Sequence, residues 1–218
     1  MKMSALMTAI ATGVTLAALT ANAHASAKLV PLSDLAKAAV AKHFQECDGA
    51  VLEGDDEPEP TEYKLTLRYS TEDQDAEPSA MRLVEYMCFR GAYNFGFVYL
   101  LGAIDEEPLP VQFAVPEVDV IYGKTDDGEE DFETVERIDM VGFSTQPDLI
   151  NPSFKLETMT LQSYSKFRGV GDAFSSGTWS FRNGHFVLVG YAMDASLDGE
   201  QNPQLDVTFG PPFDGPGE

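Results

Sequence analysis

Two cysteines are the residues whose type and spacing most directly point to covalent chemistry. Cys47 and Cys88 are the only cysteines of the chain. An even cysteine count in an exported protein favours a disulfide, and closing a loop of about 40 residues would stabilise the fold by roughly 3–4 kcal/mol. A pair of buried thiols is the alternative, and a metal site at this pair lacks other soft ligands nearby. We therefore expect a Cys47–Cys88 disulfide.

An acidic run, "GKTDDGEEDFE" from residue 123 to 133, raises the question of calcium. The EF-hand spacing fails, because placing Gly128 sixth puts Gly123 in the first place and Thr134 in the twelfth. A looser calcium site remains a weak candidate, and no other cofactor is expected. Its ligands would be Asp126, Asp127, Glu129 and Asp131.

Two arginines occupy the same place in a repeated pattern. "SAMRLVEYMCFRGAYN" (79–94) and "ETMTLQSYSKFRGVGD" (157–172) align so that Arg90 falls on Arg168. Both arginines could clamp an anion or carboxylate with bidentate geometry. The alternative, which we favour, is that each arginine binds an acidic side chain or loop carbonyl and holds its turn.

Catalytic patterns are sparse. No G-x-S-x-G, H-E-x-x-H or phosphate-binding loop occurs, and beyond His24 the histidines are His43 and His185. Paired carboxylates could support glycoside hydrolysis, but 36 acidic residues do not single out a pair. The sequence leaves enzymatic activity open and favours a non-catalytic role.

The repeated pattern predicts how the chain is organised. Further matches pair residues 69–79 with 143–153 and 97–105 with 186–194, and the growing offset suggests insertions in loops, here "SSGTWSFRNG". We interpret this as a duplication of β modules at 61–122 and 135–209, fused into one globular unit. The expected fold is α+β and predominantly antiparallel β, a sandwich or half-open barrel with one N-terminal helix within residues 26–52.

Local patterns place the elements. "PLSDLAKAAVAKHFQEC" predicts a helix capped by Ser33 or Asp34. Its apolar face would hold Leu35, Ala38, Ala39 and Phe44. Asn183-Gly184 predicts a type I′ hairpin. Alternation breaks between Leu83 and Tyr86, which indicates either a bulge or a strand with apolar neighbours on both faces.

The net charge limits the class of partner, and the first residues indicate the cellular location. Residues 1–25 resemble a signal peptide, so we expect a periplasmic or secreted protein without membrane insertion. The chain has 14 basic and 36 acidic residues, and loss of Lys2 on cleavage would bring the net charge near −23. Such a charge excludes binding to nucleic acid and disfavours anionic lipid. Residues 210–218, rich in Gly and Pro, are expected to form a flexible tail.

Parts of the chain resemble a family of exported bacterial proteins called domain of unknown function 1176. Cys88, Gly91, Ala92, Tyr93 and Asn94 match its Cys-x-x-Gly-Ala-Tyr-Asn element, and Arg168, Gly169, Gly171 and Asp172 match a later Arg-Gly-x-Gly-Asp element. Where the family has two further cysteines, this chain carries Ala173 and, approximately, Ala195. The resemblance implies export and a missing second disulfide, and it implies no activity.

These observations together favour a non-catalytic binding or inhibitor module of the cell envelope. Its partner would be a basic envelope or secreted protein, because the surface is acidic. A carboxylate-dependent hydrolase acting on envelope glycan or peptide is one alternative, and a calcium-dependent surface module is another.

Overall fold

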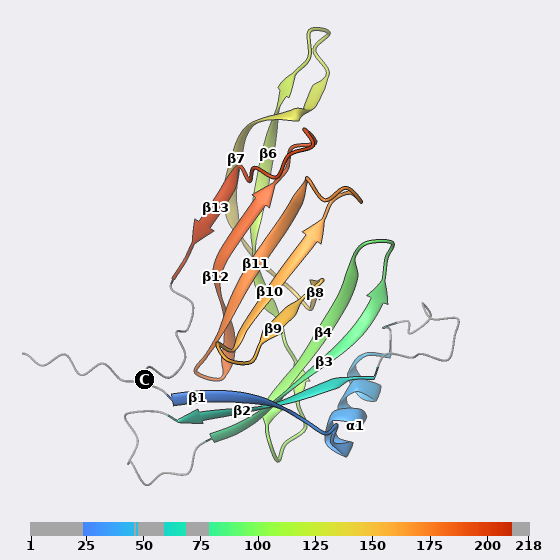
Figure 1. Cartoon of the computed structure of the whole chain (residues 1–218), viewed down its shortest axis with the longest axis vertical. Helices are drawn as coiled ribbons and strands as arrows, with labels where there is room; N and C mark the ends of the chain where they lie inside the picture. Colours follow the sequence, from blue (N-terminus) through green and yellow to red (C-terminus); the bar gives the residue numbers. More distant parts are fainter. Residues whose placement is uncertain (1–23, 46, 48–58, 69–78, 211–218) are drawn as a thin grey trace, which may run out of the picture.

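The described residues are predominantly antiparallel β and include one helix, which confirms the expected fold class (Figure 1). The computed structural model describes residues 24–45, 47, 59–68 and 79–210. The expected signal peptide lies outside the described residues except for its last two positions, and so does the expected tail from residue 211 onward.

Three β layers make up the fold. The first sheet has the order β1-β2-β3-β4-β5, with β8 also paired to β4, and the second has the order β13-β12-β11-β10-β9. Strands β6 and β7 form a separate two-stranded ribbon. The first sheet contains β1 (His24–Val30), β2 (Thr61–Arg68), β3 (Ser79–Arg90), β4 (Phe95–Ala103), β5 (Leu109–Pro110) and β8 (Asp148–Ile150). The second contains β9 (Ser153–Lys155), β10 (Thr160–Lys166), β11 (Phe174–Arg182), β12 (His185–Asp194) and β13 (Leu205–Thr208). The ribbon consists of β6 (Phe113–Lys124) and β7 (Glu130–Gln146).

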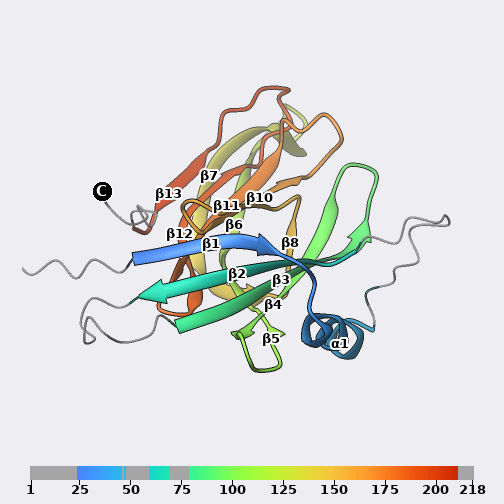
Figure 2. The same cartoon turned by 60° about the horizontal axis from the view of Figure 1, so that its bottom comes forward.

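Helix α1 (Asp34–His43) covers the face of the first sheet that is turned away from the second sheet (Figure 2). Ser33 is its N-cap, as expected, and accepts a hydrogen bond from the Ala36 backbone N–H. The predicted apolar face was wrong in part, because Leu35 and Ala38 are exposed while Ala36 and Ala39 are fully buried. Alanine side chains are short, so this face allows the helix backbone to approach the sheet closely.

A buried ion pair joins the start of the helix to the sheet. Glu62 and Arg82 are almost fully buried, with Arg82 Nη1 3.7 Å from Glu62 Oε1. The Ser33 backbone N–H and hydroxyl both donate to Glu62 Oε2, at 2.8 and 2.7 Å, and Arg82 donates to the Ser33 hydroxyl and to the Ile104 carbonyl. Buried charges require such partners, so this cluster fixes where the helix begins.

The central strands are apolar on both faces. Leu83 and Tyr99 face the second sheet within the main core, whereas Val84 and Leu100 pack under α1. This arrangement explains the broken alternation before Tyr86. The register shift in β3 lies further along, between Met87 and Phe89, so a bulge between Leu83 and Tyr86 was not the reason.

The predicted Asn183-Gly184 hairpin is confirmed. It joins β11 to β12, with φ of 49° at Asn183 and 84° at Gly184, as a type I′ turn requires. The preceding segment differs from expectation, because "SSGTWSFRNG" is not a loop insertion. Most of it belongs to β11, a central strand with Trp179 and Phe181 buried in the core.

The two Phe-Arg-Gly corners lie at the ends of hairpins, one between β3 and β4 and the other between β10 and β11. Two asparagine side chains join them. Asn94 donates to the Lys166 carbonyl at 2.8 Å and accepts from the Lys166 N–H at 3.2 Å, while Asn151 bonds to the Phe95 N–H and the Tyr164 carbonyl. Because β11 has no counterpart in the first copy of the alignment, the duplication stays a prediction.

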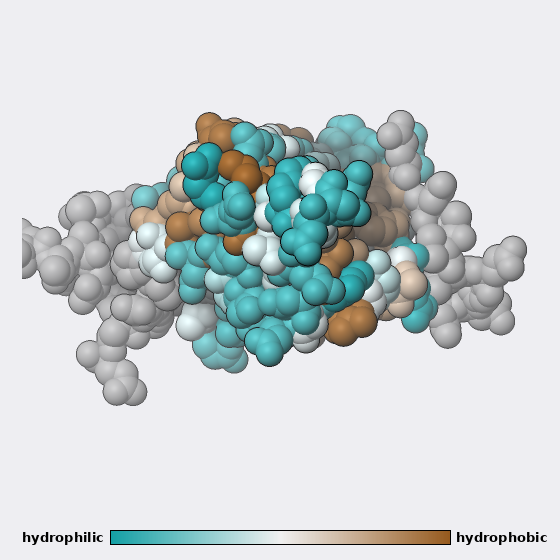
Figure 3. All heavy atoms as spheres, turned by 90° about the horizontal axis from the view of Figure 1, so that it is seen from above, coloured by the Kyte–Doolittle hydropathy of each residue, from teal (hydrophilic) through white to brown (hydrophobic). Residues whose placement is uncertain are grey.

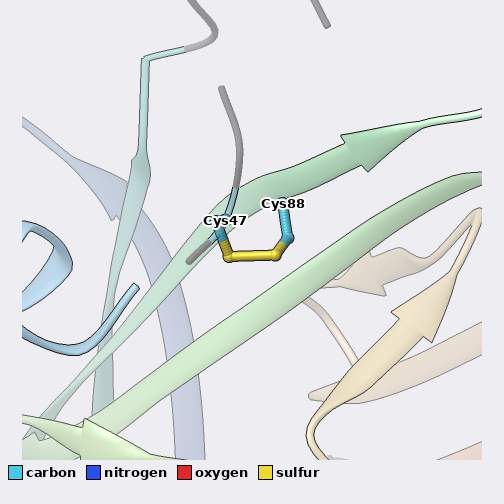
Figure 4. Close-up of a disulfide and its surroundings, with 2 residues drawn as sticks. All are labelled: Cys47 and Cys88. Carbon is cyan, nitrogen blue, oxygen red and sulfur yellow. A yellow bond between two sulfur atoms is a disulfide. The ribbon is translucent and has the colours of Figure 1, made fainter. Parts of the chain in front are cut away.

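The expected disulfide is present (Figure 4). Cys47 and Cys88 are joined, with their Cα atoms 4.5 Å apart and their positions separated by 41 in sequence. Cys88 lies at the register shift of β3, where it has no cross-strand partner in the ladder. The bond therefore ties the segment after α1 to a point where the sheet is locally irregular.

Removing this bond tests its contribution to stability. We expect Cys88→Ser to lower the melting temperature of the oxidised protein by several degrees, because a 41-residue loop is no longer constrained in the unfolded chain. Differential scanning calorimetry with and without reductant measures the effect. An unchanged melting temperature of the wild-type protein under reductant would show that the bond adds no stability.

Candidate functional site

The β6–β7 ribbon extends beyond the ends of the second sheet (Figure 1). None of the residues of β7 is fully buried, and several large apolar side chains on the ribbon are exposed. The most exposed are Val141 at 61% and Phe143 at 57%. Isolated two-stranded hairpins are only marginally stable, so the ribbon depends on contacts with the rest of the molecule.

The segment after β12 supplies those contacts. The Tyr122 hydroxyl donates to the Ala195 carbonyl at 3.2 Å, and the Leu197 N–H donates to the Phe132 carbonyl at 2.9 Å. Tyr122 and Phe132 also pack edge to face across the ribbon, with ring centroids 5.0 Å apart. Nearer the base of the ribbon, the Phe143 ring packs on Phe209.

The four acidic residues considered for calcium lie around the turn of this ribbon. The Thr125 hydroxyl donates to the Asp127 carboxylate, and Asp131 Oδ1 accepts from the Glu133 N–H at 3.1 Å, so two of the four carboxylates serve local turn structure. Across the part of the chain that the structure describes, no three His, Cys, Asp or Glu side chains are grouped as metal ligands. The four residues are neighbours in sequence but do not converge on one point.

The two repeated arginines have different surroundings. The Arg90 guanidinium lies over the Phe95 ring, 5.2 Å from its centroid. Arg168 Nε donates to the Asp172 carboxylate at 2.7 Å, and its Nη2 donates to the Leu197 carbonyl at 2.9 Å. Arg168 therefore links its own corner to the segment that supports the ribbon.

A groove of about 360 Å³ lies between the base of the ribbon and the second sheet. Its walls come from β6 and β7, and its floor comes from β10, β11 and β12. Four serines contribute to the lining. The lining residues are Val115, Pro116, Glu117, Val118, Ser144, Gln146, Ile150, Ser163, Ser165, Ser175, Gly177, Trp179, Tyr191 and Met193.

The groove exists because the inner face of the second sheet changes from large to small side chains. In β10, Leu161 is buried in the core, and Ser163 and Ser165 follow on the same face at a spacing of two. In β11, the Trp179 ring lies over Gly177, where a Cβ would come within 2.1 Å of it. The serines of β10 thus leave open space in the groove, whereas the space over Gly177 is filled by the Trp179 ring.

Two ionisable side chains, Tyr191 and Glu117, line the groove. Burial raises the pKa of Tyr191, and Glu117 raises it further, while a hydrogen bond with Ser175 lowers it. The Tyr191 phenol is therefore protonated at neutral pH and can donate. Of the described residues that line the groove, Glu117 alone carries a charged side chain.

Neither of the candidate histidines lies in this groove. His43 Nε2 is 3.2 Å from Glu107 at the end of α1, and His185 Nδ1 is 3.2 Å from the Asn183 carbonyl at the hairpin. Burial raises the pKa of Glu85, but its carboxylate accepts a hydrogen bond from Tyr99, and it does not line the groove. The geometry supports ligand binding more directly than acid–base catalysis.

The Arg168–Asp172 pair yields a prediction about pH. Asp172 is buried, and the Arg168 guanidinium holds the pKa of its carboxyl well below the usual range. A depressed folded-state pKa gives stability that is present above the unfolded-state value near 4 and is lost as the pH falls through the folded-state value. We expect Asp172→Asn to lower the melting temperature at pH 7 by several degrees, and the gap from wild type to narrow below about pH 4.

Thermal melts of both proteins at pH 7, 4 and 2.5 measure this gap. A gap of the same size at all three values would mean that the ionised pair does not stabilise the fold.

No helix in the described parts of the chain is long and apolar enough to cross a bilayer. No protein-family model matches the chain, and comparisons with curated proteins and with solved structures found no match either. The resemblance to the domain of unknown function 1176 family therefore stays a prediction.

Proposed function

We propose that this protein is a non-catalytic binding module of the cell envelope, and that its β6–β7 ribbon docks onto a basic surface of a partner protein. The supporting observation is the ribbon itself, which carries exposed Met140, Val141 and Phe143 on a projecting element. Apolar side chains held in water and surrounded by polar residues are typical of interaction sites.

Charge on the ribbon favours a basic partner. Between residues 117 and 139 the sequence has ten acidic residues and two basic ones, Lys124 and Arg137. Arg137 pairs locally with Asp139, with 2.8 Å between Nη2 and Oδ2. Seen from the ribbon end, the surface is largely hydrophilic, with hydrophobic patches beside it (Figure 3). Such a field would speed encounter with a positively charged surface and discriminate against acidic ones.

The anchoring of the ribbon favours binding without much loss of entropy. Hydrogen bonds from Tyr122 to Ala195 and from Leu197 to Phe132 hold the ribbon against the segment after β12. An element that is already ordered loses less conformational freedom on docking than a flexible loop would. The same argument applies to an inhibitor that inserts a rigid hairpin into a partner's cleft.

The envelope location rests on two features. Residues 1–25 have the pattern of an export signal, and the Cys47–Cys88 disulfide is of a kind that persists in oxidising compartments. Both features support a periplasmic or secreted protein as part of the proposal.

Neutralising the ribbon tests the proposed docking. We expect the triple variant Glu129→Gln, Glu130→Gln and Glu133→Gln to bind its partner about tenfold more weakly, because three surface ion pairs contribute about 0.5 kcal/mol each. A control with the same change in charge carries Asp105→Asn, Glu106→Gln and Glu157→Gln, which are exposed positions away from the ribbon. Each protein is immobilised and exposed to envelope extract at low and at high salt.

We expect wild type and the control to retain at least one protein at low salt and to release it at high salt. The ribbon variant should not retain that protein. If the ribbon variant and the control retain the same proteins to the same extent, docking through the ribbon is excluded.

A further inference from the structure

We infer that the groove at the base of the ribbon is a binding site for a short, uncharged saccharide. This inference rests on the side chains that line the groove, whereas the proposed docking rests on the exposed apolar side chains of β7 and on the acidic end of the ribbon. Different variants therefore test the two. The groove volume of about 360 Å³ lies at the lower end of the range for small-molecule sites, roughly 300–1,000 Å³.

The lining matches the hydrogen-bonding chemistry of a sugar. Hydroxyl groups come from Ser144, Ser163, Ser165, Ser175 and Tyr191, and a carboxamide comes from Gln146. A hydroxyl can both donate and accept, as sugar hydroxyls do, and an amide offers both roles on one group. Within the described residues, no protein group hydrogen bonds the hydroxyls of Ser144, Ser163 or Ser165, so these three are available to a ligand.

The charges of the lining argue against charged small ligands. Among the described residues, no Lys, Arg or His lines the groove, so these residues offer no counter-charge to phosphate or carboxylate groups. The single carboxylate, Glu117, is exposed and provides too few ligands for a metal cation. Glu117 can instead accept hydrogen bonds from a pair of neighbouring sugar hydroxyls.

The backbone of the floor argues against a peptide strand. Strand β11 is paired with β10 and β12, and β12 is paired with β11 and β13, so their ladder groups are already used. Strand β10 pairs with β9 only as far as Gln162. Beyond that residue, side chains occupy backbone groups on this edge of β10, because Asn94 bonds to the Lys166 backbone and Asn151 bonds to the Tyr164 carbonyl. A peptide strand therefore cannot extend the sheet at the floor, where recognition runs through side-chain hydroxyls.

The groove carries its own optical probe. Trp179 is the only tryptophan of the chain, it lines the groove, and its indole N–H donates to the Ala114 carbonyl at 2.9 Å. Trp179 is only 1% exposed, so a ligand in the groove changes the polarity around a buried ring rather than replacing water on its surface. A change in the emission of Trp179 therefore reports occupancy of this site and not of the ribbon end.

The experiment is isothermal titration calorimetry of the mature, oxidised protein, with the emission of Trp179 recorded in parallel. The probes are maltose, cellobiose and N,N′-diacetylchitobiose as neutral disaccharides, with glucuronic acid, glucosamine and a neutral Gly-Ser peptide as comparisons. We expect at least one neutral disaccharide to give a saturable change in emission. We expect Ser163→Ala with Ser165→Ala to weaken that binding by roughly thirtyfold, as the loss of two hydrogen bonds implies.

The matched control replaces two serines outside the groove, Ser176→Ala on the opposite face of β11 and Ser153→Ala on β9, and it should bind as wild type does. The ribbon variant should also bind normally, which separates this site from the proposed docking. The inference is overturned if calorimetry detects no binding of any neutral disaccharide, if only a charged sugar or the peptide binds, or if the control loses binding as much as the groove variant.

Discussion

Phe113 is the side chain on which the arrangement of the three β layers depends. It is fully buried at the first residue of the ribbon, and its ring packs on Tyr99 of the first sheet and on Trp179 and Phe186 of the second. The Trp179 indole then bonds back to Ala114, the next residue of the ribbon. A single aromatic cluster thus sets the spacing between the sheets and the angle at which the ribbon leaves them, and with it the width of the groove.

A second constraint acts on the opposite face of the first sheet. There the helix is held by the polar contacts of Ser33 with Glu62 and Arg82 as well as by alanine packing. Because β3 and β4 are covered on both faces, the first sheet is a rigid layer between helix α1 and the second sheet. The groove and the ribbon lie beyond it, where the second sheet has only the ribbon for a partner and its side chains become small and polar.

The sequence was most informative where one local rule decides the structure. The disulfide followed from the cysteine count, and the turn at Asn183-Gly184 followed from its need for positive φ at both residues. It was less informative where packing decides. The sequence pattern placed Leu35 on the buried face of the helix. In the structure the buried face holds Ala36 instead, because its short side chain lets the helix pack closer to the sheet. The repeat alignment treated "SSGTWSFRNG" as a loop insertion, although the hairpin predicted at Asn183-Gly184 requires a strand before the turn, and that strand is β11. The serines of β10 recur at every second position, yet only the fold shows that they face the ribbon.

The short strand β8 has a consequence for how the molecule comes apart. After the ribbon, the chain returns to the first sheet, where Leu149 is fully buried and pairs with Phe97, before it enters the second sheet. The two halves of the chain are therefore interleaved. A protease that cut the turn between β6 and β7 would leave two fragments that still share a sheet, a ribbon and a core. The cut molecule should therefore stay assembled, and its two fragments should unfold together in one cooperative transition.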